Sequence, residues 1–228
     1  MYKLLLLFCT NQNAIIAIGL LGIIKIIEMK KVPLLLILIR LLLGFIMILI
    51  ASTNFVHVRM ILVSLMIFGL LTDIFDGIIA RRVGVSSEKL RRMDSQVDLV
   101  FWICVGWCTW LLNPEIIIEH KYAIISIFVM EGLTYVFSIL KFGKETCTHA
   151  LLSKLWGITL LLAFVSMIGF GHAGIPFFLA VFFGIVGHID VYLIIYFLPK
   201  WTHDVPSSYH AYLIREGKSI KRHKLFNG

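Results

Sequence analysis

Four of the six aspartates in the chain have a spacing suited to a shared site. Asp73 and Asp76 are three positions apart, and Asp94 and Asp98 are four positions apart, so each pair shares one face if its segment is helical. Residues 81–93 form a short basic connection between the two segments. A short connection makes consecutive helices antiparallel, so the sequence predicts that the two acidic faces meet near the same end.

Facing carboxylates repel one another, and burial away from water adds a further penalty, so cations must compensate them. An oxygen-only ligand set with no nearby histidine or cysteine favours Mg²⁺ or Mn²⁺. Several aspartates can hold two such ions around a diphosphate. Gly77 and Ala80 leave the face beside Asp76 bare, which gives a ligand close access to the backbone. Pairing with Arg81, Arg91 and Arg92 alone would not explain why the four acids face one another.

The composition shows what kind of elements must position these residues. Of the 228 residues, 60% are hydrophobic and only 15% are charged, and the mean hydropathy is +0.95. A soluble domain carries about 45–50% apolar and about 25% charged residues, so this is a membrane protein. The net charge of +8 is explained by basic cytoplasmic loops, and we expect no nucleic-acid partner. The four cysteines have no C-x-x-C spacing, which argues against a disulfide framework or a zinc site.

Six stretches are long and apolar enough to cross a membrane as helices, which predicts an all-α polytopic bundle. They cover roughly residues 33–52, 60–80, 94–112, 121–140, 150–170 and 175–198. The basic segments 81–93, 141–144 and the tail from Lys200 all fall on one side. The positive-inside rule therefore places the acidic site and the segments before the first span and after the last span at the cytoplasmic face. The membrane would be the inner cell membrane if the protein is bacterial.

The flanking segments differ from the bundle in composition. Residues 1–31 contain an apolar run too short for a span, which indicates a helix lying on the membrane surface or a start of translation at Met29. Residues 32–199 form the predicted transmembrane domain, and residues 200–228 form a predicted basic cytoplasmic tail.

The acidic pattern resembles a known signature. Asp73-Ile-Phe-Asp76-Gly77-Ile-Ile-Ala80-Arg81, followed by Leu90, Asp94 and Asp98, resembles the CDP-alcohol phosphatidyltransferase motif D-x-x-D-G-x-x-A-R-x8-G-x3-D-x3-D. Every position matches except the second glycine, which is Leu90 here. The sequence Val32-Pro33 with Arg40 is similar to the family's opening of the first span, with Leu34 and Ile37 at its usual Asn and Thr positions.

The resemblance implies a reaction and a role for each motif residue. In this family an alcohol hydroxyl attacks the β-phosphate of a CDP-linked lipid such as CDP-diacylglycerol, and CMP leaves. By position, Asp98 would be the general base, and the resemblance also implies a homodimer. The metal ligands would be Asp73, Asp76 and Asp94, and the CDP-lipid site would comprise Asp73, Gly77, Ala80 and Arg81.

The acceptor alcohol is less closely specified than the shared chemistry. Basic residues near the junction of the fourth and fifth spans suit a phosphorylated acceptor, so glycerol 3-phosphate is the preferred candidate, with Lys144, His149 and Lys154 as acceptor-binding residues. Inositol phosphate, inositol and serine also fit the motif, as does transfer of a CDP-linked headgroup to diacylglycerol. Alternatives from other classes are a cation transporter that uses the four aspartates and a catalytically silent lipid-nucleotide binder, which Leu90 at the glycine position leaves open.

Overall fold

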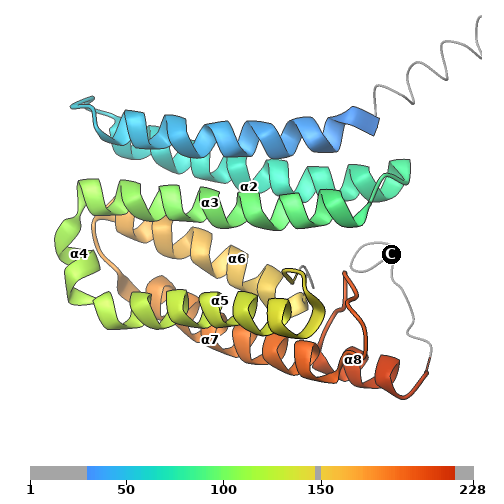
Figure 1. Ribbon diagram of the computed structural model, residues 1–228. Helices are drawn as coiled ribbons and strands as arrows, with labels where there is room; N and C mark the ends of the chain where they lie inside the picture. The colour runs from blue at the N-terminus through green and yellow to red at the C-terminus, as the bar shows by residue number, and fades with distance from the viewer. Residues whose placement is uncertain (1–29, 147–149, 219–228) are drawn as a thin grey trace, which may run out of the picture.

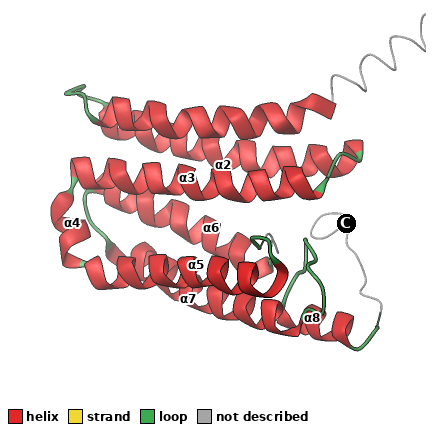
Figure 2. Cartoon of the chain, viewed as in Figure 1, coloured by secondary structure: helices red, strands yellow, loops and turns green. Residues whose placement is uncertain are grey.

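The computed structural model describes residues 30–146 and 150–218, and all regular elements in these ranges are helices (Figures 1 and 2). Six helices within these ranges are long and apolar enough to span a membrane, which confirms the predicted all-α six-span fold. The predicted surface helix before the first span lies outside the described residues. The spans are Lys30–Ala51, α2 (Val58–Val83), α3 (Glu88–Leu112), α5 (Lys121–Phe142), α6 (Leu151–Phe164) with its π-helical continuation η1 (Val165–Phe170), and α7 (Gly174–Phe197).

Two short helices were not expected from the sequence. Helix α4 (Pro114–Glu119) connects α3 to α5 and begins at a proline, whose fixed φ and missing N–H suit the first helical position. Helix α8 (Ser208–Arg215) follows α7 and packs against it. The Asp190 carboxylate accepts a hydrogen bond from the backbone N–H of Ser208 at 3.0 Å, which satisfies a free donor at the start of α8.

A tight turn between α2 and α3 positions the acidic residues. Gly84 ends α2 with a φ of 71°, a left-handed conformation that glycine adopts without steric cost. The Ser87 hydroxyl then accepts the N–H of Leu90 at 3.3 Å and caps α3, which starts at Glu88. The predicted span 94–112 begins too late, because the first turns of α3 are charged and do not belong to the apolar stretch. Asp94 and Asp98 therefore lie well inside the helix.

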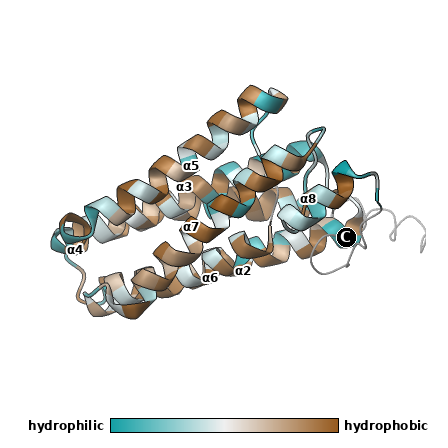
Figure 3. Cartoon of the chain, turned by 90° about the horizontal axis from the view of Figure 1, so that it is seen from below, coloured by the Kyte–Doolittle hydropathy of each residue, from teal (hydrophilic) through white to brown (hydrophobic). Residues whose placement is uncertain are grey.

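The hydrophobic core joins the first span to α2, α3 and the α6–η1 helix. In the view of Figure 1 the first span and α2 lie at the top, α3 lies below them, and α6, α5 and α7 lie below α3. Large apolar side chains also cover the outer surface, and the polar residues gather toward the ends of the helices (Figure 3). This distribution suits a lipid environment. The fully buried core residues include Met47, Leu62, Met66, Val105, Cys108 and Ile168.

The π-helical segment is tied to the bundle at the end far from the acidic residues. Arg59 donates to the carbonyl of Ile168 at 2.7 Å and to the Asn113 side chain at 2.9 Å. The Asn113 amide in turn donates to the carbonyl of Met167 at 2.8 Å. Side chains of α2 and of the α3–α4 junction thus satisfy backbone carbonyls of η1, as a membrane interior requires.

The contact between Gly69 of α2 and the Phe101 ring of α3 gives a testable prediction. A Cβ atom there would lie 2.4 Å from Cζ of Phe101, a buried ring that cannot move aside cheaply. We expect Gly69→Ala to lower the free energy of unfolding by about 1–3 kcal/mol through overpacking. Gly106→Ala on α3 is the matched control, because nothing lies within 4 Å of its Cβ position. Thermal unfolding in detergent measures both, and equal unfolding midpoints would contradict the prediction.

Candidate active site

The four aspartates of α2 and α3 converge on a single arginine of the first span. Arg40 is 1% exposed, and its guanidinium contacts all four carboxylates. Its Nη2 lies 2.9 Å from Oδ2 of Asp76, and its Nη1 lies 2.7 Å from Oδ1 of Asp98. Asp73 and Asp94 pair with the same guanidinium. The structure therefore brings the two acidic faces together, as the spacing predicts.

The central position of Arg40 was not found from the sequence. The sequence gives Arg40 only a place in the family-like opening of the first span, and it offers Arg81, Arg91 and Arg92 as partners for the acids. A usable signal existed, because an arginine surrounded by apolar residues in a spanning helix almost always pairs with acids inside the bundle. The sequence separation between the first span and the acids concealed which acids those were.

Three of the aspartates offer a ligand set for a divalent cation. One carboxylate oxygen each from Asp73, Asp76 and Asp94 lie within 4.8 Å of one another. Asp76 and Asp94 are buried, and Asp73 is partly exposed. One guanidinium cannot neutralise four carboxylates, so the charge of the cluster and its oxygen-only donors both suit Mg²⁺ or Mn²⁺. Asp98 stands apart from this group of three and is 31% exposed at its side chain.

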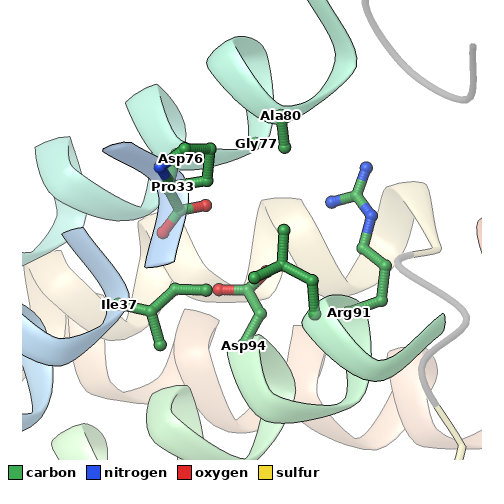
Figure 4. Close-up of a pocket in the computed structure, with 8 residues that line it drawn as sticks. Pro33, Ile37, Asp76, Gly77, Ala80, Arg91 and Asp94 are labelled. Atoms are coloured by element: carbon green, nitrogen blue, oxygen red, sulfur yellow. The ribbon is translucent and has the colours of Figure 1, made fainter. Parts of the chain in front are cut away.

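A small pocket adjoins the carboxylates between the first span, α2 and α3 (Figure 4). A Cβ atom at Gly77 would lie 3.5 Å from Nη1 of Arg81 and 3.9 Å from Nη1 of Arg91, so two guanidinium groups border the bare helix face. Leu90 places a side chain in the pocket wall where the motif has a glycine. The lining residues are Pro33, Ile37, Asp76, Gly77, Ala80, Leu90, Arg91 and Asp94.

The segment after α7 lies beside Arg91, one of the basic residues that line the pocket. Trp201 donates its indole N–H to the carbonyl of Glu145 at 2.9 Å, and Val205 is 1% exposed. Oδ2 of Asp204 lies 3.5 Å from Nε of Arg91. The sequence predicts residues 200–228 as a basic cytoplasmic tail, and within it residues 200–218 pack against the bundle through their own apolar side chains. Residues 219–228 lie outside the described part of the chain.

The three predicted acceptor-binding residues have different surroundings. Lys154, near the start of α6, interacts electrostatically with Arg81, Arg91, Asp73 and Asp204. Lys144 instead pairs with Glu88 at 2.8 Å and lies over the Trp201 ring. His149 falls outside the described residues. Of the two that the structure describes, Lys154 is the one whose electrostatic neighbours include motif residues.

The connection after α5 is held by a partly buried ion pair. Arg92 contacts Glu145 at 2.6 Å, and Gln96 donates to the same carboxylate at 2.6 Å. The hydrogen bond from Arg92 lowers the pKa of Glu145 below its usual range. This pair joins α3 to the connection between α5 and α6.

A second polar pair lies inside the bundle. Nε2 of His188 is 2.8 Å from Oε2 of Glu131, and Nδ1 of His188 is 2.6 Å from the carbonyl of Gly184. The pair joins α5 to α7 and satisfies both side chains, so its geometry supports a packing role.

Comparison with known proteins gives one match. The family model for CDP-alcohol phosphatidyltransferase matches residues 30–186, which include the first span, the acidic residues and the pocket. No curated protein and no solved structure matches the chain significantly.

The position of Arg40 predicts competition with divalent cations for the same carboxylates. We expect Arg40→Gln to lower the unfolding midpoint in EDTA, because removing one partner from a buried ion pair costs roughly 3–5 kcal/mol. Added Mn²⁺ should then raise the midpoint of this variant more than that of the wild type. Thermal unfolding with and without Mn²⁺ measures the effect.

Arg59→Gln is the control, since Arg59 is also a partly buried arginine with defined acceptors but lies at the opposite end of α2. It should lower stability and leave the Mn²⁺-induced shift equal to that of the wild type. An Mn²⁺-induced shift in Arg40→Gln no larger than in Arg59→Gln would contradict competition at the acidic cluster.

Proposed function

Because the chain belongs to the CDP-alcohol phosphatidyltransferase family, we propose that it transfers a phosphatidyl group from CDP-diacylglycerol to glycerol 3-phosphate and releases CMP. The family assigns the chain to the transferases of phospholipid biosynthesis that act on substituted phosphate groups. The observation that supports the proposal most directly is the convergence of four carboxylates beside a bare helix face that two arginines border.

We assign Asp73, Asp76 and Asp94 as the ligands of Mg²⁺ or Mn²⁺. The negative charge of the four carboxylates is large enough for two such ions. The bound cations would neutralise the diphosphate and stabilise the negative charge on the departing CMP. The chain's own contribution is to hold the carboxylates in place across the α2–α3 interface. Arg40 supplies part of the compensating charge from the first span.

Asp98 is the proposed general base. It lies one helical turn from Asp94 on α3, outside the group of three ligand oxygens, and its side chain is partly exposed. Its carboxylate would take the proton of the acceptor hydroxyl while that oxygen bonds to the β-phosphorus. The bond from this phosphorus to the oxygen bridging the two phosphates then breaks, and CMP carries that oxygen away. Asp73, Gly77, Ala80 and Arg81 would line the CDP-lipid site.

The acceptor assignment depends on the basic side of the pocket. Lys154 has Arg81 and Arg91 as electrostatic neighbours, and three cations suit an acceptor that carries its own phosphate. Lys144 and His149 are the other proposed acceptor-binding residues, and Lys144 would have to exchange its ion pair with Glu88 for the acceptor phosphate. We further propose that the site faces the cytoplasm, that the membrane is the inner cell membrane if the protein is bacterial, and that the protein forms a homodimer.

A CMP-release assay tests the proposed reaction. Purified protein is given CDP-diacylglycerol with glycerol 3-phosphate, inositol phosphate, inositol or serine, in Mg²⁺, Mn²⁺ or excess EDTA. We expect the fastest release with glycerol 3-phosphate and none in EDTA. Preference for an acceptor without phosphate would overturn the acceptor assignment, and full activity in EDTA would overturn the metal assignment.

Substitutions at Asp98 and Asp76 separate the proposed base from a proposed ligand. Asp98→Asn keeps the side-chain shape and removes proton acceptance, so turnover should fall about 10²–10⁴-fold while Mn²⁺-dependent CDP-diacylglycerol binding survives. Asp76→Asn should weaken Mn²⁺ and CDP-diacylglycerol binding together. Equilibrium binding with each variant is the measurement. If Asp98→Asn loses binding as severely as Asp76→Asn, Asp98 belongs with the ligands.

A further inference from the structure

We propose that Arg91 is a phosphate-binding residue of the pocket, and that its ligand is the diphosphate of the CDP-linked lipid. This inference rests on the proposed function and adds a residue outside the family motif, because the signature leaves the position after its second glycine free.

The burial of Arg91 leaves one donor nitrogen without a partner. Its side chain is 5% exposed, and its Nη2 has no hydrogen-bond partner among the described residues. Leaving a buried donor without a hydrogen bond costs free energy, and the cost is larger for a charged group than for a neutral one. Such a donor is therefore a candidate to bind an acceptor on a ligand. An anionic oxygen is the acceptor that a guanidinium prefers.

The location of Arg91 shows which acceptor would reach it. Arg91 lines the same pocket as Asp76, Gly77 and Asp94, and Figure 4 shows its side chain extending from α3 toward the level of Ala80. Its Nη1 is 3.9 Å from the Cβ position of Gly77, the bare face that also meets Arg81. A diphosphate held beside the carboxylates would therefore lie between two guanidinium groups, whose planar forks match phosphate geometry.

The other side of the guanidinium is fixed by the protein. Nε of Arg91 donates to Oγ of Ser86 at 3.0 Å and lies 3.5 Å from Oδ2 of Asp204. Asp204 has a φ of 56°, which is uncommon for a residue other than glycine, and it precedes the buried Val205. The backbone after α7 is thus bent so that a carboxylate faces Nε of Arg91. Because Nε has these partners, the terminal nitrogens are left for the pocket.

Leu90, which stands where the family motif has a glycine, is compatible with phosphate binding by Arg91. A glycine in the pocket wall would let a ligand approach the backbone of α3 closely, and the Leu90 side chain takes up that space. A long side chain from the next residue can still reach a ligand that stands further from the helix. Arg91 would thereby supply a charged contact where the bare backbone is covered.

The test is the affinity for CDP, measured by isothermal titration calorimetry with the full chain in detergent and Mn²⁺. Arg91→Gln should weaken CDP binding about 10- to 100-fold, as expected for the loss of charge-assisted hydrogen bonds. Arg91→Lys keeps the charge without the planar fork and should weaken binding less. Arg92→Gln is the matched control, because this neighbour pairs with Glu145 and is not among the residues that line the pocket, and it should bind CDP as the wild type does.

The outcomes separate this inference from the proposed function. Wild-type CDP affinity in either Arg91 variant, with its unfolding transition intact, would overturn the role of Arg91 and leave the proposed reaction standing. A raised KM for glycerol 3-phosphate with unchanged CDP affinity would assign Arg91 to the acceptor instead, and so also overturn it. A wild-type protein that fails to bind CDP would overturn the proposed function together with this inference.

Discussion

The need to compensate four clustered carboxylates, of which Asp76 and Asp94 are buried, governs the arrangement of this end of the bundle. Asp73, Asp76, Asp94 and Asp98 face one another inside a body whose outer surface is mainly apolar, where an uncompensated charge is expensive. Arg40 meets all four from the first span, so three helices are held together by one charged contact. Such a contact is strong only while every member is present, which makes the first span part of the site as well as part of the scaffold.

The geometry of this contact follows from local features of α2 and α3. The left-handed turn at Gly84 and the Ser87 cap return the chain within a few residues, so the acids of α2 and α3 lie at matching depth. The missing side chain of Gly69 leaves space on α2 for the Phe101 ring of α3. Helix-period spacing then directs each acidic pair inward.

The sequence was sufficient for the features that depend on local pattern and insufficient for those that depend on distant contacts. Apolar length predicted the six spans, and the three- and four-residue spacing predicted that the acids meet. The charged first turns of α3 hid its true start at Glu88. The partners of Arg40 and Arg91 could not be predicted, because Asp73 and Asp204 lie far along the chain from them and neither pairing has a periodic signature.

The charges around the pocket explain why cation binding and nucleotide binding are expected to depend on one another. A diphosphate is repelled by the four carboxylates that the site places beside it, and Arg40 alone leaves most of their charge uncompensated. Arg81, Arg91 and Lys154 lie on the other side of the pocket, but Asp204 offsets part of their attraction. The protein's own cations are therefore too few to hold a diphosphate against the acids. Additional cations at Asp73, Asp76 and Asp94 would reverse the sign of that interaction, so affinity for the nucleotide should rise with occupancy of the acidic cluster.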